Sequence, residues 1–306
     1  MGRVSPVSCD RRRGVPAVTA RWLTGQVACW YAANARDLPW RANDASPWAV
    51  LVSEFMLQQT PVARVLPVWQ AWMRRWPTPA ALAADEPAEA IRGWGRLGYP
   101  RRAIRLHAAA RAIDAEHDGV VPASEEELRR LPGVGAYTAA AVAAFAYRRR
   151  AVVLDTNVRR VLGRVVGGEP APAAGITRAE WTRAERLLPG DGPRAAAWSV
   201  GLMELGALVC TNRSPACARC PLRSRCRWLA AGRPAPAEPR RVQAYAGTDR
   251  QARGRLLALL READGTVDAA AFAAAWPAVA QRERALAGLV ADGLAVPTGV
   301  GRYRLP

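Results

Sequence analysis

The spacing of apolar residues predicts a mainly α-helical protein over residues 1–230. Apolar side chains recur there at helical intervals, Pro and Gly separate the segments, and few stretches alternate as strands do. The clearest segment begins with Ser46 and Pro47, which are typical of an N-cap and a first helical position. We therefore expect a helix from Pro47 to about Gln58.

A different pattern follows this region. Residues 231–248 carry several prolines and no apolar periodicity, which predicts a linker. Beyond it, three periodic segments predict helices and the end of the chain predicts a β-hairpin; the expected ranges are 253–261, 268–276, 281–294 and 295–304. Three helices followed by a hairpin indicate a small winged-helix-like module over residues 249–306.

Composition favours a folded protein without a membrane span. Of the 306 residues, 50% are hydrophobic, yet no stretch approaches the roughly 18 consecutive apolar residues of a transmembrane helix. The basic start at Arg11, Arg12 and Arg13 is not followed by the apolar core of a signal peptide. We expect a cytoplasmic protein.

The charge of the chain indicates a polyanionic partner. The net charge is +18, and all 44 basic residues are arginines, whose planar fork suits phosphate oxygens. The alternative is an arginine-rich genome that raises the charge without a function. Because the chain contains no lysine, it has no lysine with which to form a Schiff base, and this excludes one class of DNA lyase.

Four of the six cysteines lie close together, in the pattern Cys210-x6-Cys217-x2-Cys220-x5-Cys226. Structural zinc usually has two Cys-x2-Cys pairs where this segment has one, and a reducing compartment disfavours disulfides. A [4Fe–4S] cluster therefore fits the spacing best. The cluster would pin a loop whose arginines face phosphates: Arg213, Arg219, Arg223, Arg225 and Arg227.

Residues 124–147 predict a helix-hairpin-helix element. A capping-box pattern opens a short helix at Ser124, Gly133 and Gly135 allow a tight turn, and a second helix begins at Ala136. Turn amides and a helix N-terminus of this kind bind a DNA phosphate without reading bases. The alternative is an ordinary pair of helices joined by a glycine turn.

Glu54 is the candidate general acid. Its neighbours on the predicted helix are apolar: Val50, Leu51 and Leu57. Desolvation in such a setting would raise its pKa, as a general acid near neutral pH requires. The alternative is a glutamate that points into solvent beside an amphipathic face.

Asp155 is the candidate anion. It follows an apolar run and precedes a helix, where an N-cap would accept backbone N–H groups at the positive end of the helix dipole. Both effects would lower its pKa and keep it ionised; the alternative is a cap with no further role. One protonated and one ionised carboxyl group are what cleavage of a glycosidic bond through an oxocarbenium-like state needs.

Taken in order, these motifs resemble the MutY family of adenine DNA glycosylases, a branch of the endonuclease III and helix-hairpin-helix superfamily. The resemblance runs from Leu38 to Cys226 and includes the cysteine spacing. It implies a mainly α helix-hairpin-helix glycosylase fold with a [4Fe–4S] cluster loop. It also implies a monomeric, nucleoid-associated enzyme that removes adenine opposite 8-oxoguanine or guanine in double-stranded DNA.

The resemblance also implies roles for individual residues. Glu54 would protonate N7 of adenine, Asp155 would stabilise the sugar cation, and Tyr137 would assist. Endonuclease III relatives carry their Schiff-base lysine at the position of Tyr137, so hydrolysis without a lyase step is implied. The adenine pocket would comprise Arg36, Trp40, Arg41 and Leu57. Contacts to DNA and the lesion, some of which enter the duplex during base extrusion, would come from Gln59, Thr60, Leu97, Tyr99, Gly133, Gly135 and Asn157.

Two departures from the family pattern stand out. Val200 occupies a position where the family often has a glutamine or glutamate at the adenine edge. The residues after the linker are too few for the Nudix-like domain of many MutY proteins. Three alternatives stay open: an endonuclease III-like enzyme, a thymine or uracil mismatch glycosylase, and a non-catalytic iron–sulfur DNA-binding regulator.

Overall fold

The computed structural model describes residues 17–236 and 245–306. Cys9, Arg11 to Arg13 and much of the predicted linker 231–248 lie outside the described residues. The chain divides into two compact units, each formed from two separate stretches of sequence: 17–35 with 152–236, and 36–151 with 245–306.

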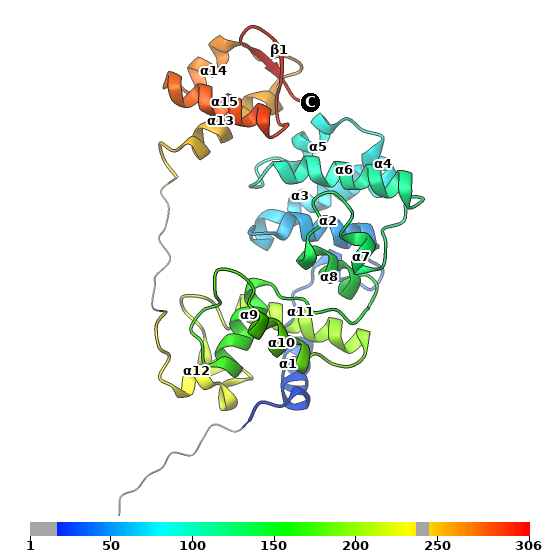
Figure 1. Ribbon diagram of the computed structural model, residues 1–306, viewed down its shortest axis with the longest axis vertical. Helices are drawn as coiled ribbons and strands as arrows, with labels where there is room; N and C mark the ends of the chain where they lie inside the picture. Colours follow the sequence, from blue (N-terminus) through cyan, green and yellow to red (C-terminus); the bar gives the residue numbers. More distant parts are fainter. Residues whose placement is uncertain (1–16, 237–244) are drawn as a thin grey trace, which may run out of the picture. The chain divides into compact units, whose positions relative to one another are not determined.

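The first unit joins a helix from the start of the chain to a helical region that follows residue 152. Its elements are α1 (Ala20–Asn34), α9 (Thr156–Leu162), the π-helix η2 (Gly163–Gly167), α10 (Arg178–Leu187), α11 (Gly192–Leu208), the short helices η3 (Cys217–Arg219) and η4 (Arg223–Arg225), and α12 (Arg227–Ala230). Helix α11 packs against both α1 and α9, and α12 packs against η2 (Figure 1).

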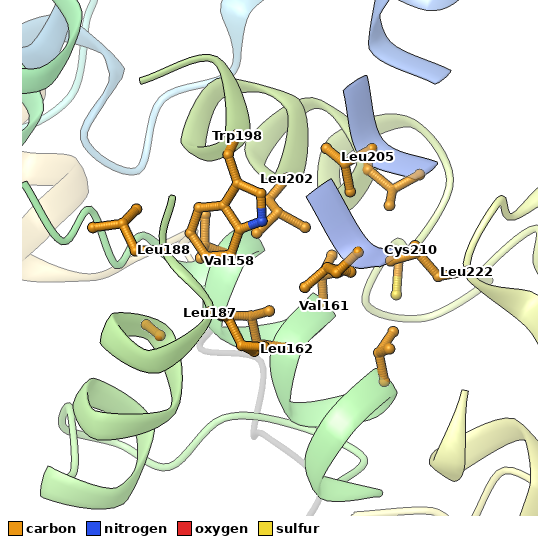
Figure 2. Packing of buried hydrophobic residues seen from close by; sticks show 14 of the residues in the cluster. Val158, Val161, Leu162, Leu187, Leu188, Trp198, Leu202, Leu205, Cys210 and Leu222 are labelled. Carbon is orange, nitrogen blue, oxygen red and sulfur yellow. The ribbon is translucent and has the colours of Figure 1, made fainter. Parts of the chain in front are cut away.

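Apolar side chains from these helices form one continuous core. Figure 2 shows Val158 of α9 next to the ring of Trp198 on α11, and Leu162 of α9 beside Leu187 of α10. Cys210 belongs to the same buried cluster, so the cysteine segment is attached directly to the core of the unit. Burial of this apolar surface is what holds α9 and α11 together.

The second unit begins with helices α2 to α8 and ends with the C-terminal helices and hairpin. Its elements are η1 (Pro39–Arg41), α2 (Pro47–Leu57), α3 (Val62–Arg75), α4 (Pro79–Ala83), α5 (Pro87–Trp94), α6 (Arg101–Glu116), α7 (Glu125–Leu128), α8 (Ala136–Phe145), α13 (Asp249–Glu262), α14 (Ala269–Ala275), α15 (Val279–Ala291), β1 (Val296–Gly299) and β2 (Arg302–Arg304). Helix α2 packs against α3 and α8, and every residue from Trp48 to Met56 is buried.

Indole rings brace this unit. Trp72 packs edge-to-face against Trp76 and Trp94, with ring centroids 4.5 and 5.9 Å apart. The indole N–H of Trp48 donates to the backbone oxygen of Trp76 at 3.0 Å, and that of Trp69 donates to the backbone oxygen of Ala49 at the same distance. Buried tryptophans therefore fix α2 by both packing and hydrogen bonds.

The helix starts predicted from capping residues are confirmed. Ser46 accepts the Ala49 N–H at 3.2 Å before α2, and Asp155 accepts the Val158 N–H at 2.6 Å before α9. Ser124 accepts the Glu127 N–H at 3.2 Å before α7. The mainly helical class is confirmed as well, and among the described residues no helix has the length and apolar character needed to cross a membrane.

The C-terminal helices and hairpin also form where the pattern predicts them. Helix α15 starts two residues before the expected range and ends three before its end, because helix ends are set by caps that periodicity does not reveal. Strands β1 and β2 pair antiparallel, with Val296 opposite Arg304. Val267 adds an isolated bridge to Tyr303, exchanging backbone hydrogen bonds of 2.8 and 2.9 Å.

Candidate active site

Glu54 lies on the buried helix α2, and its side chain is almost enclosed. The residue is 5% exposed, and Val50 and Leu51 on the preceding turn are fully or nearly fully buried. Leu57, one turn later, is partly exposed. The interpretation of Glu54 as a solvent-facing residue of an amphipathic helix is therefore wrong, and the apolar setting expected for it is confirmed.

The end of α2 is tied to the helix-hairpin-helix element. Gln58 donates from its side-chain amide to the hydroxyl of Thr138, at the start of α8, at 3.2 Å. Tyr137, one residue earlier, is partly buried. Helix α2, which carries Glu54, is therefore joined to helix α8, which carries Tyr137, by this hydrogen bond and by the packing of the two helices.

The turn at residues 131–136 has the form that the glycine pattern predicts. Leu131 and Val134 are buried anchors, whereas Gly133 and Gly135 are exposed. Gly133 has a φ of +79°, and a Cβ added there would lie 2.7 Å from the Cβ of Arg105. Both the left-handed backbone and this close approach require glycine, so the exposed turn is held in one conformation.

Gln59 and Tyr99, two of the expected lesion contacts, meet at the surface. The Tyr99 hydroxyl donates to the Gln59 side-chain oxygen at 2.7 Å, and both residues have a φ of +57°. Thr60 and Leu97 are buried, so their side chains do not lie at the surface with these two.

Of the residues expected in the adenine pocket, Arg36 precedes η1, Trp40 and Arg41 lie in η1, and Leu57 ends α2. Trp40 is buried and packs edge-to-face on Trp69, with ring centroids 5.4 Å apart. Arg36, Arg41 and Leu57 are partly exposed. Because η1 packs against α2, these residues belong to the same unit as Glu54.

Asp155 is the first member of a hydrogen-bonded chain in the other unit. Its carboxylate accepts from the side-chain amide of Asn157 at 2.6 Å, and the Asn157 oxygen accepts from the guanidinium of Arg160 at 2.7 Å. The same guanidinium donates to the backbone oxygens of Gly206 and Cys210 at 2.8 and 2.7 Å. Arg160 therefore links the candidate anion to the cysteine segment.

The expected lowering of the Asp155 pKa is wrong in direction. Desolvation by burial raises the pKa of this carboxyl and outweighs the hydrogen bonds from Val158 and Asn157 and the charge of Arg160, all of which act to lower it. The N-cap exists as predicted, but a local capping pattern carries no information about burial, which dominates here.

Arg159, Arg160 and Arg164 are buried. In the sequence they stand out only as part of the excess of basic residues. Arg159 forms a bidentate pair with Glu180, at 3.0 and 2.9 Å. The Arg164 guanidinium donates to the Cys210 sulfur at 3.5 Å and to the backbone oxygens of Thr211 and Asn212. Spacing of four along α9 and η2 was the only available signal for the last two, and it indicated a shared face without indicating burial.

The four clustered cysteines line one cavity, together with Arg164, Trp228 and apolar side chains. Cys210 and Cys226 are buried, and Cys217 and Cys220 are partly exposed. Burial raises the pKa of the Cys220 thiol to about 12, and the charges of the other three sulfurs add to the shift. The four cysteines line the same cavity, and a bound cationic centre would offset the mutual repulsion of their thiolates.

Within 17–236 and 245–306, no group of three or more His, Cys, Asp or Glu side chains has the geometry of a single-metal site. The surrounding groups nevertheless suit a sulfur-rich centre. Arg164 supplies a hydrogen-bond donor to a thiolate and stacks on Trp228, with its Cζ atom 4.3 Å from the ring centroid. The residues present therefore fit an iron–sulfur cluster held by thiolates and screened by apolar side chains.

The cysteine segment presents most, but not all, of its arginines to solvent. Arg213, Arg219, Arg223 and Arg227 are exposed, as expected for side chains that face phosphates. Arg225 instead donates to the backbone oxygen of Ala17 at 2.7 Å and lies over the ring of Trp22. The expectation that all five face DNA is wrong for Arg225 in this conformation.

Comparison with known proteins places the chain in a family. Residues 52–185 match the HhH-GPD superfamily of base excision DNA repair proteins. A protein from Mycolicibacterium smegmatis named adenine DNA glycosylase is 54% identical over 282 residues, which cover 92% of this chain and 94% of that protein. The chain belongs to the adenine DNA glycosylase family.

Other members of the superfamily share less of the sequence. A protein from Aeropyrum pernix named thymine-DNA glycosylase is 39% identical and covers 64% of this chain and 89% of its own length. The solved structure of a thermostable thymine-DNA glycosylase superposes with a TM-score of 0.62 at 26% identity and covers 69% of this chain. These matches confirm the helix-hairpin-helix glycosylase fold, and the predicted resemblance to MutY is confirmed with them.

Proposed function

We propose that this adenine DNA glycosylase family member is a monofunctional enzyme. It hydrolyses the N-glycosidic bond of adenine mispaired with 8-oxoguanine or guanine in double-stranded DNA. One observation carries the proposal: Glu54, 5% exposed, is buried on a helix whose other residues are apolar except for Ser53. A carboxyl group kept away from water is suited to donate a proton to a base that leaves from the sugar.

In the proposed reaction, Glu54 donates its proton to N7 of the extruded adenine. The C1′–N9 bond then breaks with both electrons passing to the base, and the Asp155 carboxylate stabilises the positive charge that develops on the sugar. Water adds to C1′ and gives up a proton to the Glu54 carboxylate, which restores the acid, so that free adenine and an abasic site remain. Tyr137 assists at the position where lyases carry a lysine, and the lack of any lysine leaves no Schiff-base step.

The proposed DNA contacts divide between phosphate binding and recognition of the mispair. The turn at Gly133 and Gly135 binds a backbone phosphate through exposed amides. Gln59 and Tyr99 occupy the gap left by the extruded base, and the buried Thr60 and Leu97 support this surface. Asn157 is proposed as a separate DNA contact beside Asp155. The adenine pocket takes Arg36, Trp40, Arg41 and Leu57. Duplex DNA is consistent with the net charge of +18.

We also propose that one [4Fe–4S] cluster is held by Cys210, Cys217, Cys220 and Cys226. When bound, it would supply a structural cross-link among the four cysteines of the segment. The residues themselves do the rest: Arg164 donates to the Cys210 sulfur, and the exposed arginines of the segment bind phosphates. We further propose three regions along the sequence: a catalytic region over 1–230, a linker over 231–248 and a winged-helix-like module over 249–306.

The decisive experiment compares base excision on four duplexes under single-turnover conditions. They contain A:8-oxoguanine, A:G, T:G and thymine glycol, and strand scission by alkali reports the abasic site. We expect scission of the adenine strand only, and no scission by Glu54→Gln, which keeps the size of the side chain. Scission at T:G would favour a thymine mismatch enzyme, a function suggested by the similarity to a thymine-DNA glycosylase. Tight binding without scission of any duplex would favour a non-catalytic DNA-binding protein.

A further inference from the structure

Tyr99 is an exposed aromatic residue held in an unfavourable backbone conformation. It lies between α5 and α6, 46% exposed, with a φ of +57°. Its hydroxyl is fixed by the hydrogen bond to Gln59, whose φ is also +57°. Non-glycine residues keep such a conformation only where the surroundings impose it, and such residues concentrate at functional sites.

Guanidinium groups from two distant parts of the sequence lie beside this ring. The Cζ atom of Arg102, on α6, is 4.4 Å from the ring centroid, and that of Arg250, on α13, is 6.0 Å from it. Arg250 also lies 5.7 Å from the ring of Tyr245, which is 53% exposed. Exposed aromatic rings interleaved with arginines are typical of surfaces on which nucleic-acid bases stack and phosphates bind.

The position of Arg250 is held by polar contacts between α13–α15 and α5–α6. Arg92 donates to the backbone oxygen of Ala263 at 3.1 Å, and Arg101 forms an ion pair with Asp292 at 3.1 Å. Asp292 also accepts from Arg253 of α13, so one carboxylate connects α13 to α6. These contacts lie inside the second unit, as does Tyr99.

The charge of Arg250 is available to a ligand. The neighbouring carboxylate, Asp249, is engaged by Arg284 at 3.2 Å and by the amide of Gln281 at 2.9 Å. Arg250 itself is exposed. A guanidinium that is exposed, and whose neighbouring acid is already neutralised, adds a full positive charge to this face.

We propose that the C-terminal helices and hairpin are part of the DNA-binding surface, and that Arg250 binds a phosphate of the DNA strand whose bases meet Tyr99. Arg102 and Arg250 both lie near the ring, and in this proposal the exposed tyrosine meets a base while the arginine of α13 holds the adjoining backbone. The inference rests on the proposed function for the identity of the DNA, a duplex with a mispaired adenine. It assigns to residues 249–306 a direct role in binding that duplex.

The test measures binding of the full-length protein to an A:8-oxoguanine duplex over a range of salt concentrations. Arg250→Ala should weaken binding roughly three- to tenfold and reduce the slope of log affinity against log salt by about 1, because one phosphate contact is lost. Arg255→Ala is the matched control: the same charge is removed from the same helix at an exposed position, about 140° around its axis. It should leave affinity and slope unchanged.

A double-mutant cycle with Tyr99→Phe and Tyr99→Ala tests whether the two side chains act together. Arg250→Ala should lose roughly two- to fivefold less affinity in the Tyr99→Ala background than in the wild type, and the full amount in the Tyr99→Phe background. Equal affinities and salt slopes for Arg250→Ala and Arg255→Ala would overturn the inference. Adenine excision by the wild type is scored separately, so a protein that binds through Arg250 without excising adenine contradicts the proposed function alone.

Discussion

Gly206→Ala is expected to destabilise the first unit and to displace the residues that hold Asp155. Gly206 lies inside helix α11 where this helix meets the start of α9. A Cβ atom added there would lie 2.6 Å from the Cβ, 3.0 Å from the Cα and 3.1 Å from the backbone oxygen of Asn157. All three distances are shorter than the 3.4 Å at which ordinary contact begins, and two of the atoms belong to the backbone, so no side-chain rotation relieves them.

The expected magnitude follows from two opposing effects. Overpacking of this kind costs about 1–3 kcal/mol, whereas alanine is favoured over glycine inside a helix by about 0.5–1 kcal/mol. The net loss for Gly206→Ala is therefore about 0–2.5 kcal/mol, centred near 1 kcal/mol, which corresponds to roughly 2–4 °C in Tm. Asn157 donates to Asp155, so we also expect the rate of single-turnover excision to fall when α9 moves.

Gly25→Ala is the matched control, because the chain offers a second glycine inside a helix of the same unit. Gly25 is exposed on α1 and a Cβ added there meets no atom within 4 Å. Only the helix preference remains, and the variant should gain about 0.5–1 kcal/mol. Thermal unfolding of the two variants, followed by circular dichroism, measures the difference. If Gly206→Ala were as stable as Gly25→Ala, the reasoning that α9 packs too closely on α11 to admit a Cβ atom at Gly206 would be wrong.

Three further predictions concern buried charges and the cysteines. Glu180→Ala should lower the free energy of unfolding by about 3–5 kcal/mol, because it leaves the buried charge of Arg159 without its acidic partner. Glu126→Ala is the control: it removes an exposed i,i+4 ion pair and should cost less than about 0.5 kcal/mol. Urea unfolding compares the two variants. Burial acts to raise the pKa of Glu180, but hydrogen bonds from Arg159 and Thr177 lower it overall, so the stabilisation by this pair should be present at neutral pH and be lost as pH falls through the folded-state pKa. Burial raises the pKa of Asp155, so the ionised carboxylate destabilises the fold. Asp155→Asn should be inactive in excision, and the stability of this variant relative to the wild type should increase from pH 4 to pH 7. Equal Tm differences between variant and wild type at both pH values would contradict this trend. Cys210→Ser should abolish the visible absorbance expected of an iron–sulfur protein and lower the Tm, and unchanged absorbance would refute the assignment of this ligand.

Much of the candidate site was predictable because its signals are local. Ser46 and Asp155 begin helices through contacts with amides three residues ahead, and such contacts depend on neighbouring residues only. Gly133 was predictable for a similar reason, since the tolerance of a positive φ is an intrinsic property of glycine. The cysteine spacing belongs to the same class, because a loop of fixed length limits which centre it can enclose.

Other properties were decided by residues far away in the sequence. The burial of Glu54 depends on the packing of α2 against α3 and α8, and the burial of Arg160 depends on α11 and the cysteine segment. The meeting of Tyr99 with Arg250 joins positions that no periodicity relates. In each case the deciding quantity is the local solvent exposure or the distance between two side chains.

By itself, the amino-acid sequence determined the helical class, the helix starts, the glycine turn, the cysteine spacing and the arginine-only positive charge. Only the tertiary structure decided which charges are withdrawn from water. It placed Arg159, Arg160 and Arg164 in the interior rather than at phosphates, and it reversed the expected direction of the Asp155 pKa shift. The physical reason is that the free energy of a charge depends on its desolvation and on partners brought together by folding, and neither is written in the residues next to it.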